Sequence, residues 1–227
     1  MCGRFTQSAD LQTLEIRFGF SAPATELSLR FNVAPMQFAP VVALEDGERR
    51  LKLMRWGLLP SWAKDEALAG RLINARAETI ADKPSFRQAL KSRRCLVLAD
   101  GFFEWAKSGA GKLPHYFYLR GGEPFAFAGL WERWTTPEGE ALLTFTIITT
   151  APNDLVKPVH DRMPVVLRRE DEQAWLDPAT GAEELAKLLV PYAPELMASH
   201  PVSRLAGVHR PAPRLGASAP SPPCSAH

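Results

Sequence analysis

Apolar residues recur with a helical period only in short stretches of this chain. Leu11, Leu14 and Phe18 lie three or four residues apart, so they share one face of a helix that Ser8 can cap and Gly19 ends. Further short helical stretches are predicted within residues 74–90, with a break at Pro84, and at residues 170–176 and 181–190.

Runs of β-branched and aromatic residues predict a larger share of strand. Residues 41–44 and 51–56 flank the turn sequence EDGE, which is typical of a hairpin, and GLLPSWA is typical of a loop. The strongest pattern is RCLVLADGFFEW at 94–105, which we interpret as one strand. Three further runs follow, at residues 116–119, 125–131 and 142–150.

Strands and short helices follow one another irregularly, without the regular alternation of a parallel α/β sheet. This order predicts an α+β fold, built as a single domain around a curved, mostly antiparallel β-sheet or barrel-like core with short flanking helices. The predicted domain covers residues 2–190. From about residue 198 the chain is rich in Pro, Ala and Ser and has no periodicity, so residues 198–227 are predicted to be a disordered tail.

The composition limits which cellular compartment and which binding partners we expect. With 227 residues, 46% of them hydrophobic, the chain can bury one sizeable core. The net charge is only +2, so if the protein binds nucleic acid, its positive charge must be concentrated in one place on the surface. Cys2, Cys95 and Cys224 form no metal-ligand spacing, which favours a reducing compartment. No signal sequence and no apolar run of about 20 residues occurs, so we expect a cytoplasmic protein without a membrane partner.

The common cofactor-binding and catalytic signatures do not occur in the sequence. GxxxxGKS/T, GxGxxG after a strand, HExxH and GxSxG are all missing, so neither a cofactor nor a metal is expected. Polar residues instead stand out within stretches that are otherwise typical of a core. They are Asn74, Arg76 and Glu78 in INARAET, Glu104 in ADGFFEW, His160, Asp161 and Arg162 in VHDRMP, and Arg55, Trp56 and Trp62 in RWGLLPSW.

Each of these residues has a structural interpretation beside a chemical one. Glu104 is either a solvent-facing strand residue or a half-buried carboxylate whose raised pKa suits proton transfer. His160 is either a surface loop residue or a proton shuttle near neutral pH. Asn74 is either a helix cap or a group that holds a reactive residue in place. Arg4 and Arg76 are either ordinary surface charges or ligands for phosphate. Trp56 and Trp62 are either core residues or platforms on which bases stack.

The N-terminal sequence MCGRF raises a sharper possibility. A small second residue permits removal of Met1, and the remaining Cys2 would carry an α-amine and a thiol on adjacent carbons. Such a residue traps aldehydes, because the amine forms a Schiff base and the thiol then closes a thiazolidine ring. The α-amine has a pKa of about 8, so part of it is neutral at physiological pH. A lone cysteine at a chain terminus is more often incidental.

Seven short motifs in a fixed order carry a resemblance to a known family. They are MCGRF, NVAP at 32–35, RWGLLPSW at 55–62, NARAET at 74–79, RCLVLADGFFEW at 94–105, FAGLW at 127–131 and HDRMP at 160–164. Over roughly residues 2–190 the chain resembles the SRAP family, named for SOS response-associated peptidase. Members of that family bind single-stranded DNA and single/double-strand junctions, and they crosslink to abasic sites through the N-terminal cysteine.

The resemblance implies roles for particular residues. Cys2 would be the nucleophile, Asn74 would position it and the opened sugar, Glu104 would be the catalytic carboxylate, and His160 would be the acid–base group. The DNA-binding residues that it implies are Arg4, Arg76, Trp62, Asn32, Pro35 and Arg162.

The expected protein is therefore a monomeric abasic-site sensor that acts on single-stranded DNA. It would form a thiazolidine crosslink to protect the lesion, with AP-lyase activity and autoproteolytic removal of Met1, and it would associate with the nucleoid when DNA is damaged. Two alternatives remain at this point. One is a cysteine peptidase that acts on other proteins, with Cys2, His160 and Asn74 as a papain-like set. The other is a non-catalytic module that binds single-stranded DNA.

Overall fold

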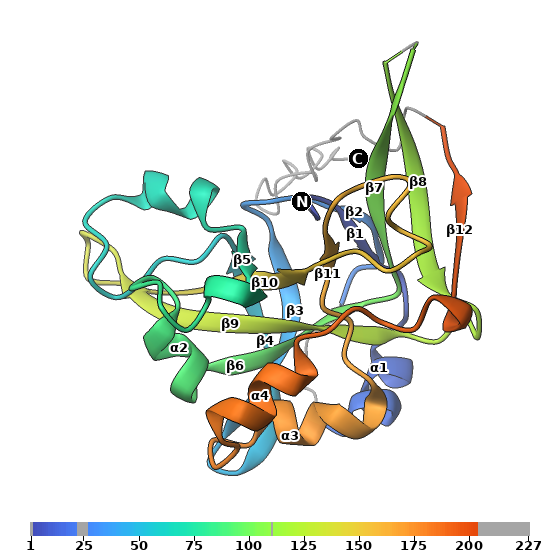
Figure 1. Cartoon of the computed structure of the whole chain (residues 1–227). Coiled ribbons are helices and arrows are strands. Elements are labelled where there is room, and N and C mark those ends of the chain that lie inside the picture. Colours follow the sequence, from blue (N-terminus) through green and yellow to red (C-terminus); the bar gives the residue numbers. More distant parts are fainter. Residues whose placement is uncertain (1, 22–26, 110, 204–227) are drawn as a thin grey trace, which may run out of the picture.

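The structure is a computed structural model that describes residues 2–21, 27–109 and 111–203 (Figure 1). The strands are β1 (Phe5–Gln7), β2 (Arg30–Val33), β3 (Phe38–Glu45), β4 (Glu48–Trp56), β5 (Asn74–Arg76), β6 (Arg94–Ala99), β7 (Gly101–Ser108), β8 (Gly111–Leu119), β9 (Phe125–Thr135), β10 (Ala141–Thr150), β11 (Met163–Pro164) and β12 (Met197–Pro201). The helices are α1 (Leu11–Phe18), α2 (Arg87–Ser92), α3 (Glu172–Leu176) and α4 (Ala182–Leu188). Short 3₁₀ turns are η1 (Glu66–Arg71), η2 (Ala77–Thr79), η3 (Arg169–Asp171) and η4 (Pro194–Leu196).

Strands β10, β4, β3, β6 and β9 pair in that order, and β9 pairs again with β10, so this part of the sheet closes on itself. Its pairings are antiparallel except that β10 runs parallel to β4. The short strand β5 also pairs with β10, in parallel, and β11 pairs with β10 in antiparallel. This closed barrel confirms the predicted α+β fold with a curved, mostly antiparallel core.

The second sheet has the order β12-β8-β7-β1-β2 and is antiparallel throughout. Its aromatic side chains pack on those of the barrel. The ring centroid of Phe5 on β1 lies 5.3 Å from that of Trp56, and the ring centroid of Phe102 on β7 lies 6.0 Å from that of Phe127. These fully buried contacts hold the first strand, and the N-terminal residues that precede it, against the barrel.

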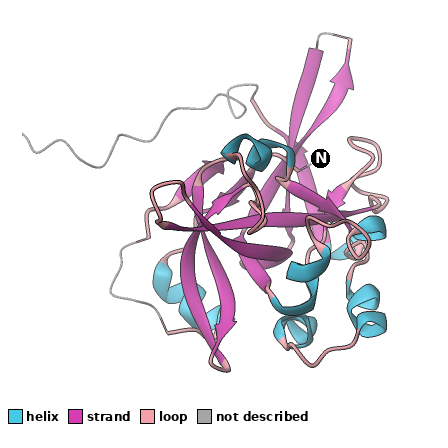
Figure 2. Cartoon of the chain, turned by 90° about the vertical axis from the view of Figure 1, so that its left-hand side faces the viewer, coloured by secondary structure: helices cyan, strands magenta, loops and turns pink. Residues whose placement is uncertain are grey.

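A second buried cluster lies where the helices cover the barrel. Leu14 and Phe18 of α1, Trp175 of α3 and Leu185 of α4 share this cluster, and Figure 1 shows α1, α3 and α4 together below the sheets. Figure 2 shows the helices around the outside of the strands. The predicted period of α1 is confirmed, because Leu14 and Phe18 are its buried residues.

The predicted cap of α1 at Ser8 is wrong. The N-cap is Asp10, whose side chain accepts a hydrogen bond from the backbone N of Thr13 at 2.7 Å. Ser8 instead donates from its hydroxyl to Asp100 at 2.8 Å. The predicted end of the helix is confirmed: Gly19 adopts the left-handed conformation, with φ of 63°, that favours glycine.

The segment with the strongest strand pattern was predicted to be one strand, but it forms two. RCLVLADGFFEW forms two strands, β6 in the barrel and β7 in the second sheet, and the chain passes between the sheets at Asp100. The Asp100 carboxylate accepts hydrogen bonds from Thr6, Ser8 and Ala9. This set of donors joins the start of β7 to the end of β1.

Two further segments differ from the sequence prediction. Residues 74–76, predicted as part of a helical stretch, form strand β5, because their backbone pairs with β10. Residues 198–201, predicted to lie in the disordered tail, belong instead to strand β12 (Met197–Pro201), which pairs with β8. The rest of the predicted tail, residues 204–227 with Cys224, lies outside the described residues. None of the helices in the described ranges is long and apolar enough to cross a membrane.

Candidate active site

The N-terminal segment runs beside the edge of the β7 strand. Phe5 pairs with Phe102, and the backbone N of Phe103 donates to the carbonyl of Arg4 at 3.0 Å. This pairing places Cys2 beside the part of β7 that carries Glu104. The Cys2 side chain is fully buried, and its Sγ lies 3.8 Å from the Arg4 carbonyl, to which it donates.

Asn74 reaches the same place from the barrel. It is the first residue of β5, and its Nδ2 donates to the carbonyl oxygen of Cys2 at 2.9 Å. Its Oδ1 is buried and accepts no hydrogen bond from the residues that the structure describes. Asn74 therefore anchors the backbone of Cys2 and has an amide oxygen left to accept from a bound molecule. This position excludes the alternative that Asn74 caps a helix.

Glu104 and His160, which were predicted to be the catalytic carboxylate and the acid–base group, lie close together. Oε2 of Glu104 lies 3.9 Å from Nε2 of His160, and the Glu104 side chain is 2% exposed. Burial raises the pKa of Glu104 to about 7. Burial also lowers the pKa of His160 below its usual value, so the imidazole is neutral at physiological pH. Glu104 therefore does not face solvent, and it is more deeply buried than the half-buried carboxylate of the chemical interpretation.

The Cys2 thiol is held in its neutral form. Burial raises the pKa of this thiol well above its usual value, and the negative charge of Glu104 raises it further. A thiol in such surroundings is a poor source of thiolate at neutral pH. It reacts well only when a neighbouring base accepts its proton during bond formation.

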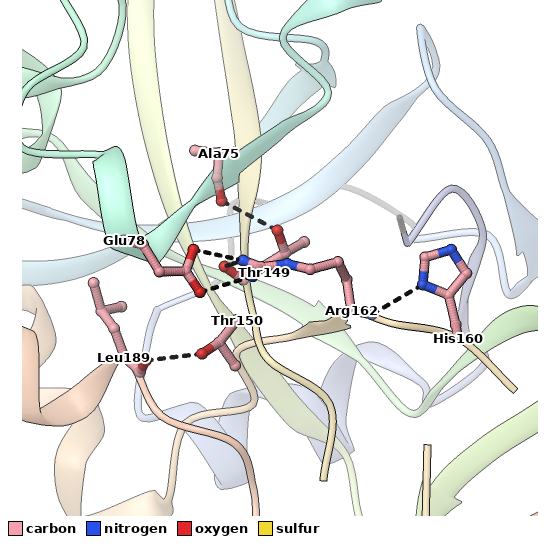
Figure 3. A network of polar contacts seen from close by, with 7 residues as sticks. All are labelled: Ala75, Glu78, Thr149, Thr150, His160, Arg162 and Leu189. Atoms are coloured by element: carbon pink, nitrogen blue, oxygen red, sulfur yellow. Dashed lines mark hydrogen bonds and ion pairs between the residues drawn. The ribbon is translucent and has the colours of Figure 1, made fainter. Parts of the chain in front are cut away.

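The loop that carries His160 is held by a network of polar contacts (Figure 3). The backbone N of Arg162 donates to Nδ1 of His160 at 3.0 Å. The guanidinium of Arg162 forms two hydrogen bonds to the Glu78 carboxylate, at 2.7 and 2.8 Å. The sequence singled out Glu78 as an unusual polar residue but gave no role to it. Its proximity to Asn74 along the chain was the only signal available.

The residues predicted to bind DNA are spread around this centre. Nη1 of Arg4, the residue before β1, donates to Oδ1 of Asn32 on β2 at 3.1 Å. Pro35 lies in the turn that follows β2, and Arg76 is exposed at the end of β5. Arg4 and Arg76 each lie two residues along the chain from a catalytic candidate, Cys2 and Asn74, and the hydrogen bond from Arg4 brings Asn32 beside the N-terminal segment. Their contacts with DNA stay predictions.

The two tryptophans of RWGLLPSW differ sharply in exposure. Trp56 is fully buried in the core between the sheets, whereas Trp62 is 57% exposed. Trp62 lines a surface pocket together with Lys64 and Arg71. The side chain of Arg162 is 15% exposed and already bound to Glu78, so it differs from a free surface arginine. In the described ranges, no three His, Cys, Asp or Glu side chains lie close enough together to hold a metal ion.

Comparisons with known proteins agree with this arrangement. The family model described as "SOS response associated peptidase (SRAP)" matches residues 1–208. The chain is 45% identical over 209 residues to the abasic site processing protein YoqW of Bacillus subtilis, covering 90% of this chain and 93% of that protein. It is 32% identical over 221 residues to the abasic site processing protein YedK of Escherichia coli, covering 91% and 94% of the two chains.

A solved structure shares the fold. The crystal structure of a protein from Bacteroides thetaiotaomicron superposes with a TM-score of 0.83 and 31% sequence identity, covering 90% of this chain and 93% of that one. Because the family model spans nearly the whole chain and the relatives are 45% and 32% identical to it, the chain belongs to the SRAP family of SOS response associated peptidases.

Proposed function

We propose that this protein processes abasic sites in single-stranded DNA by forming a covalent bond through Cys2. The proposal is carried by the way four separate parts of the chain come together at one place. Asn74 donates to the Cys2 carbonyl, and the charge of Glu104 acts on the Cys2 thiol. His160 lies 3.9 Å from Glu104. Relatives that are named abasic site processing proteins support it, since they match this chain over nine tenths of its length.

The first step uses the α-amine that is freed when Met1 leaves. The neutral amine attacks the aldehyde carbon of the opened sugar, and the carbinolamine loses water to give an imine. Both changes need a proton to be delivered and removed, which Glu104 and His160 supply. The hydrogen bond from Asn74 to the Cys2 carbonyl holds the amine-bearing residue still, so the reaction gains from proximity.

The second step uses the thiol. Sulfur adds to the imine carbon, the C=N bond becomes a single bond, and the thiol proton passes through the Glu104 carboxylate to the nitrogen. The product is a thiazolidine ring. This order fits the neutral state of the Cys2 thiol, because sulfur is needed only after the imine has formed. An imine that escapes ring closure acidifies the neighbouring sugar carbon, and β-elimination would then give AP-lyase activity.

The geometry favours this trap over a papain-like peptidase acting on other proteins. A papain-like cysteine needs a lowered pKa, and its amide partner orients the imidazole. Here burial raises the pKa of Cys2, and the Asn74 amide donates to the Cys2 carbonyl. Peptide cleavage remains in our proposal for one event, the removal of Met1, which we assign to the same Cys2, Glu104 and His160.

The DNA would follow the basic and aromatic residues around this centre. Arg4 and Arg76 would contact phosphates on either side of the lesion, and Asn32 and Pro35 would line the path of the strand. Trp62, exposed beside Lys64 and Arg71, would stack on a base. Single-stranded DNA and single/double-strand junctions are the partners that this arrangement serves, with the protein acting as a monomer.

The N-terminus separates this function from its alternatives. The test mixes the protein with a single-stranded oligonucleotide carrying one abasic site and separates the products on a denaturing gel. We expect a slow band for the parent protein, and none for Cys2→Ala or for a variant with one glycine inserted between Met1 and Cys2.

Crosslinking by the glycine-inserted variant would contradict the proposal, because a reaction that needs only the thiol tolerates the insertion. Equal DNA protection by Cys2→Ala, without any covalent band from the parent protein, would favour the simple binding module.

A further inference from the structure

An ion pair outside the four catalytic candidates joins two segments that each carry one of them. Glu78 lies in η2, the turn directly after the strand β5 that carries Asn74, and Arg162 follows His160 by two residues. The carboxylate and the guanidinium meet through two hydrogen bonds of 2.7 and 2.8 Å. Figure 3 shows the Arg162 side chain extending from the loop of His160 past Thr149 to Glu78.

Arg162 is fixed from a second direction by β10. Its Nη2 donates to the Thr149 carbonyl at 2.6 Å, and the Thr149 hydroxyl donates to the Ala75 carbonyl at 3.4 Å. The same residue of β10 therefore contacts both the Asn74 strand and the Arg162 guanidinium. A planar guanidinium held by one carboxylate and one carbonyl has little freedom to turn.

This anchoring reaches the imidazole through the backbone. The N–H of Arg162 donates to Nδ1 of His160 at 3.0 Å, so Nδ1 of the neutral ring acts as an acceptor and the ring proton lies on Nε2. Nε2 is the atom that faces Glu104, at 3.9 Å. A carboxylate oxygen of Asp161 also lies 3.0 Å from Nδ1, but the Asp161 side chain is 89% exposed and can turn into water, whereas a backbone N–H cannot.

We infer that Glu78 and Arg162 are a positioning pair that fixes the tautomer and the direction of His160. Neither side chain touches the reacting atoms in this arrangement; they act through the backbone N–H of Arg162. Arg162 was predicted to bind DNA, but its guanidinium is bound to the protein's own Glu78 carboxylate. Its catalytic consequence rests on the proposed function, whereas its effect on the imidazole does not.

The test compares Glu78→Gln with a matched control, Glu45→Gln. Glu45 forms a similar ion pair with Lys52 at 2.7 Å, and its side chain is 52% exposed against 51% for Glu78. That control pair lies on the β3–β4 hairpin and has no contact with His160. Because both carboxylates are half exposed, both variants should fold with melting temperatures close to that of the parent.

Three measurements separate positioning from a merely structural role. Nitrogen-15 NMR of His160 identifies the tautomer. Binding to a single-stranded oligonucleotide with a tetrahydrofuran abasic analogue measures DNA affinity. Single-turnover crosslinking to a true abasic site measures the rate. For Glu78→Gln we expect a mixed tautomer and a crosslinking rate lowered by about tenfold. We expect an affinity for the analogue within about twofold of the parent. Glu78→Asp should restore part of the rate, and Glu45→Gln should change nothing.

An unchanged His160 tautomer in Glu78→Gln would overturn the inference, and so would a loss confined to DNA affinity. If the parent protein forms no crosslink at all, the proposed function fails. The tautomer measurement then still decides whether the pair positions His160.

Discussion

Oε2 of Glu104, on a strand of the second sheet, lies 3.9 Å from Nε2 of His160, on a loop that follows the barrel. Burial raises the pKa of the carboxyl to about 7 and lowers the pKa of the imidazole below its usual value. Glu104 can therefore take up and release a proton near neutral pH, beside an imidazole that is neutral there. Such a carboxyl suits a reaction with successive proton transfers.

The buried Glu104 carboxylate should lower the stability of the folded protein at alkaline pH. Its pKa is raised from 4.5 to about 7, so the stabilisation from the bound proton is fully present below about pH 4.5 and is lost as the pH rises through 7. Glu104→Gln removes this titration. We expect the variant to be more stable than the parent at pH 8, by at most on the order of 3 kcal/mol.

Urea unfolding of both proteins at pH 4.5 and at pH 8 measures this difference. Near pH 4.5 the two free energies of unfolding should agree, because the protonated carboxyl and the amide have similar shapes and no charge. A variant that is less stable than the parent at pH 8 would show that the carboxylate is not penalised by burial.

Loss of the Asn74 amide should slow crosslinking while it weakens the fold only modestly. Asn74→Ala removes the 2.9 Å hydrogen bond to the Cys2 carbonyl, and a bond of this kind stabilises a protein by only about 1 kcal/mol. The crosslinking rate should fall by about 10- to 100-fold, because the nucleophile is no longer held in place. Asn74→Asp keeps the size but not the donor, and should show the same loss under single-turnover conditions. An unimpaired Asn74→Asp would mean that the donor has no role.

Removal of the exposed Trp62 ring should weaken DNA binding without changing stability. Trp62 is 57% exposed, so Trp62→Ala should alter the free energy of unfolding by no more than about 0.5 kcal/mol. Base stacking contributes about 1–3 kcal/mol per base, so affinity for single-stranded DNA should fall by about fivefold or more.

The control for that variant is Ile16→Ala, on α1, whose side chain is 74% exposed. Fluorescence anisotropy with a labelled oligonucleotide compares the two. Equal affinities for both variants would place the DNA path away from Trp62.

The parts of the fold that the sequence predicts correctly are those with a local signal. Gly19 ends α1 because a left-handed residue is required there, and the EDGE turn separates β3 from β4. The errors arise where a distant partner decides the outcome. Asn74–Arg76 is a strand because β10 lies beside it, and the predicted strand at 94–105 divides at Asp100 because that residue gathers donors from the end of β1.

The candidate site follows a similar division. The chemistry of an N-terminal cysteine can be deduced from MCGRF alone. The expectation that Cys2, Asn74, Glu104 and His160 form one site rested on the family resemblance of the motifs, because their spacing in the sequence does not indicate it. Burial of Glu104, which raises its pKa, has no signature in the sequence beyond the aromatic neighbours. The partnership of Glu78 with Arg162 joins residues far apart in the chain, so only the structure reveals it.

The central claim is a covalent bond between Cys2 and an abasic site, and intact mass spectrometry tests it most directly. The parent protein and Cys2→Ala are each mixed with a single-stranded oligonucleotide that carries one abasic site, and each protein alone reports whether Met1 has been removed. The account predicts a species at the summed mass of the protein without Met1 and the DNA, less one water, for the parent only. Bound DNA without such a species, in a protein that has lost Met1, would contradict the account.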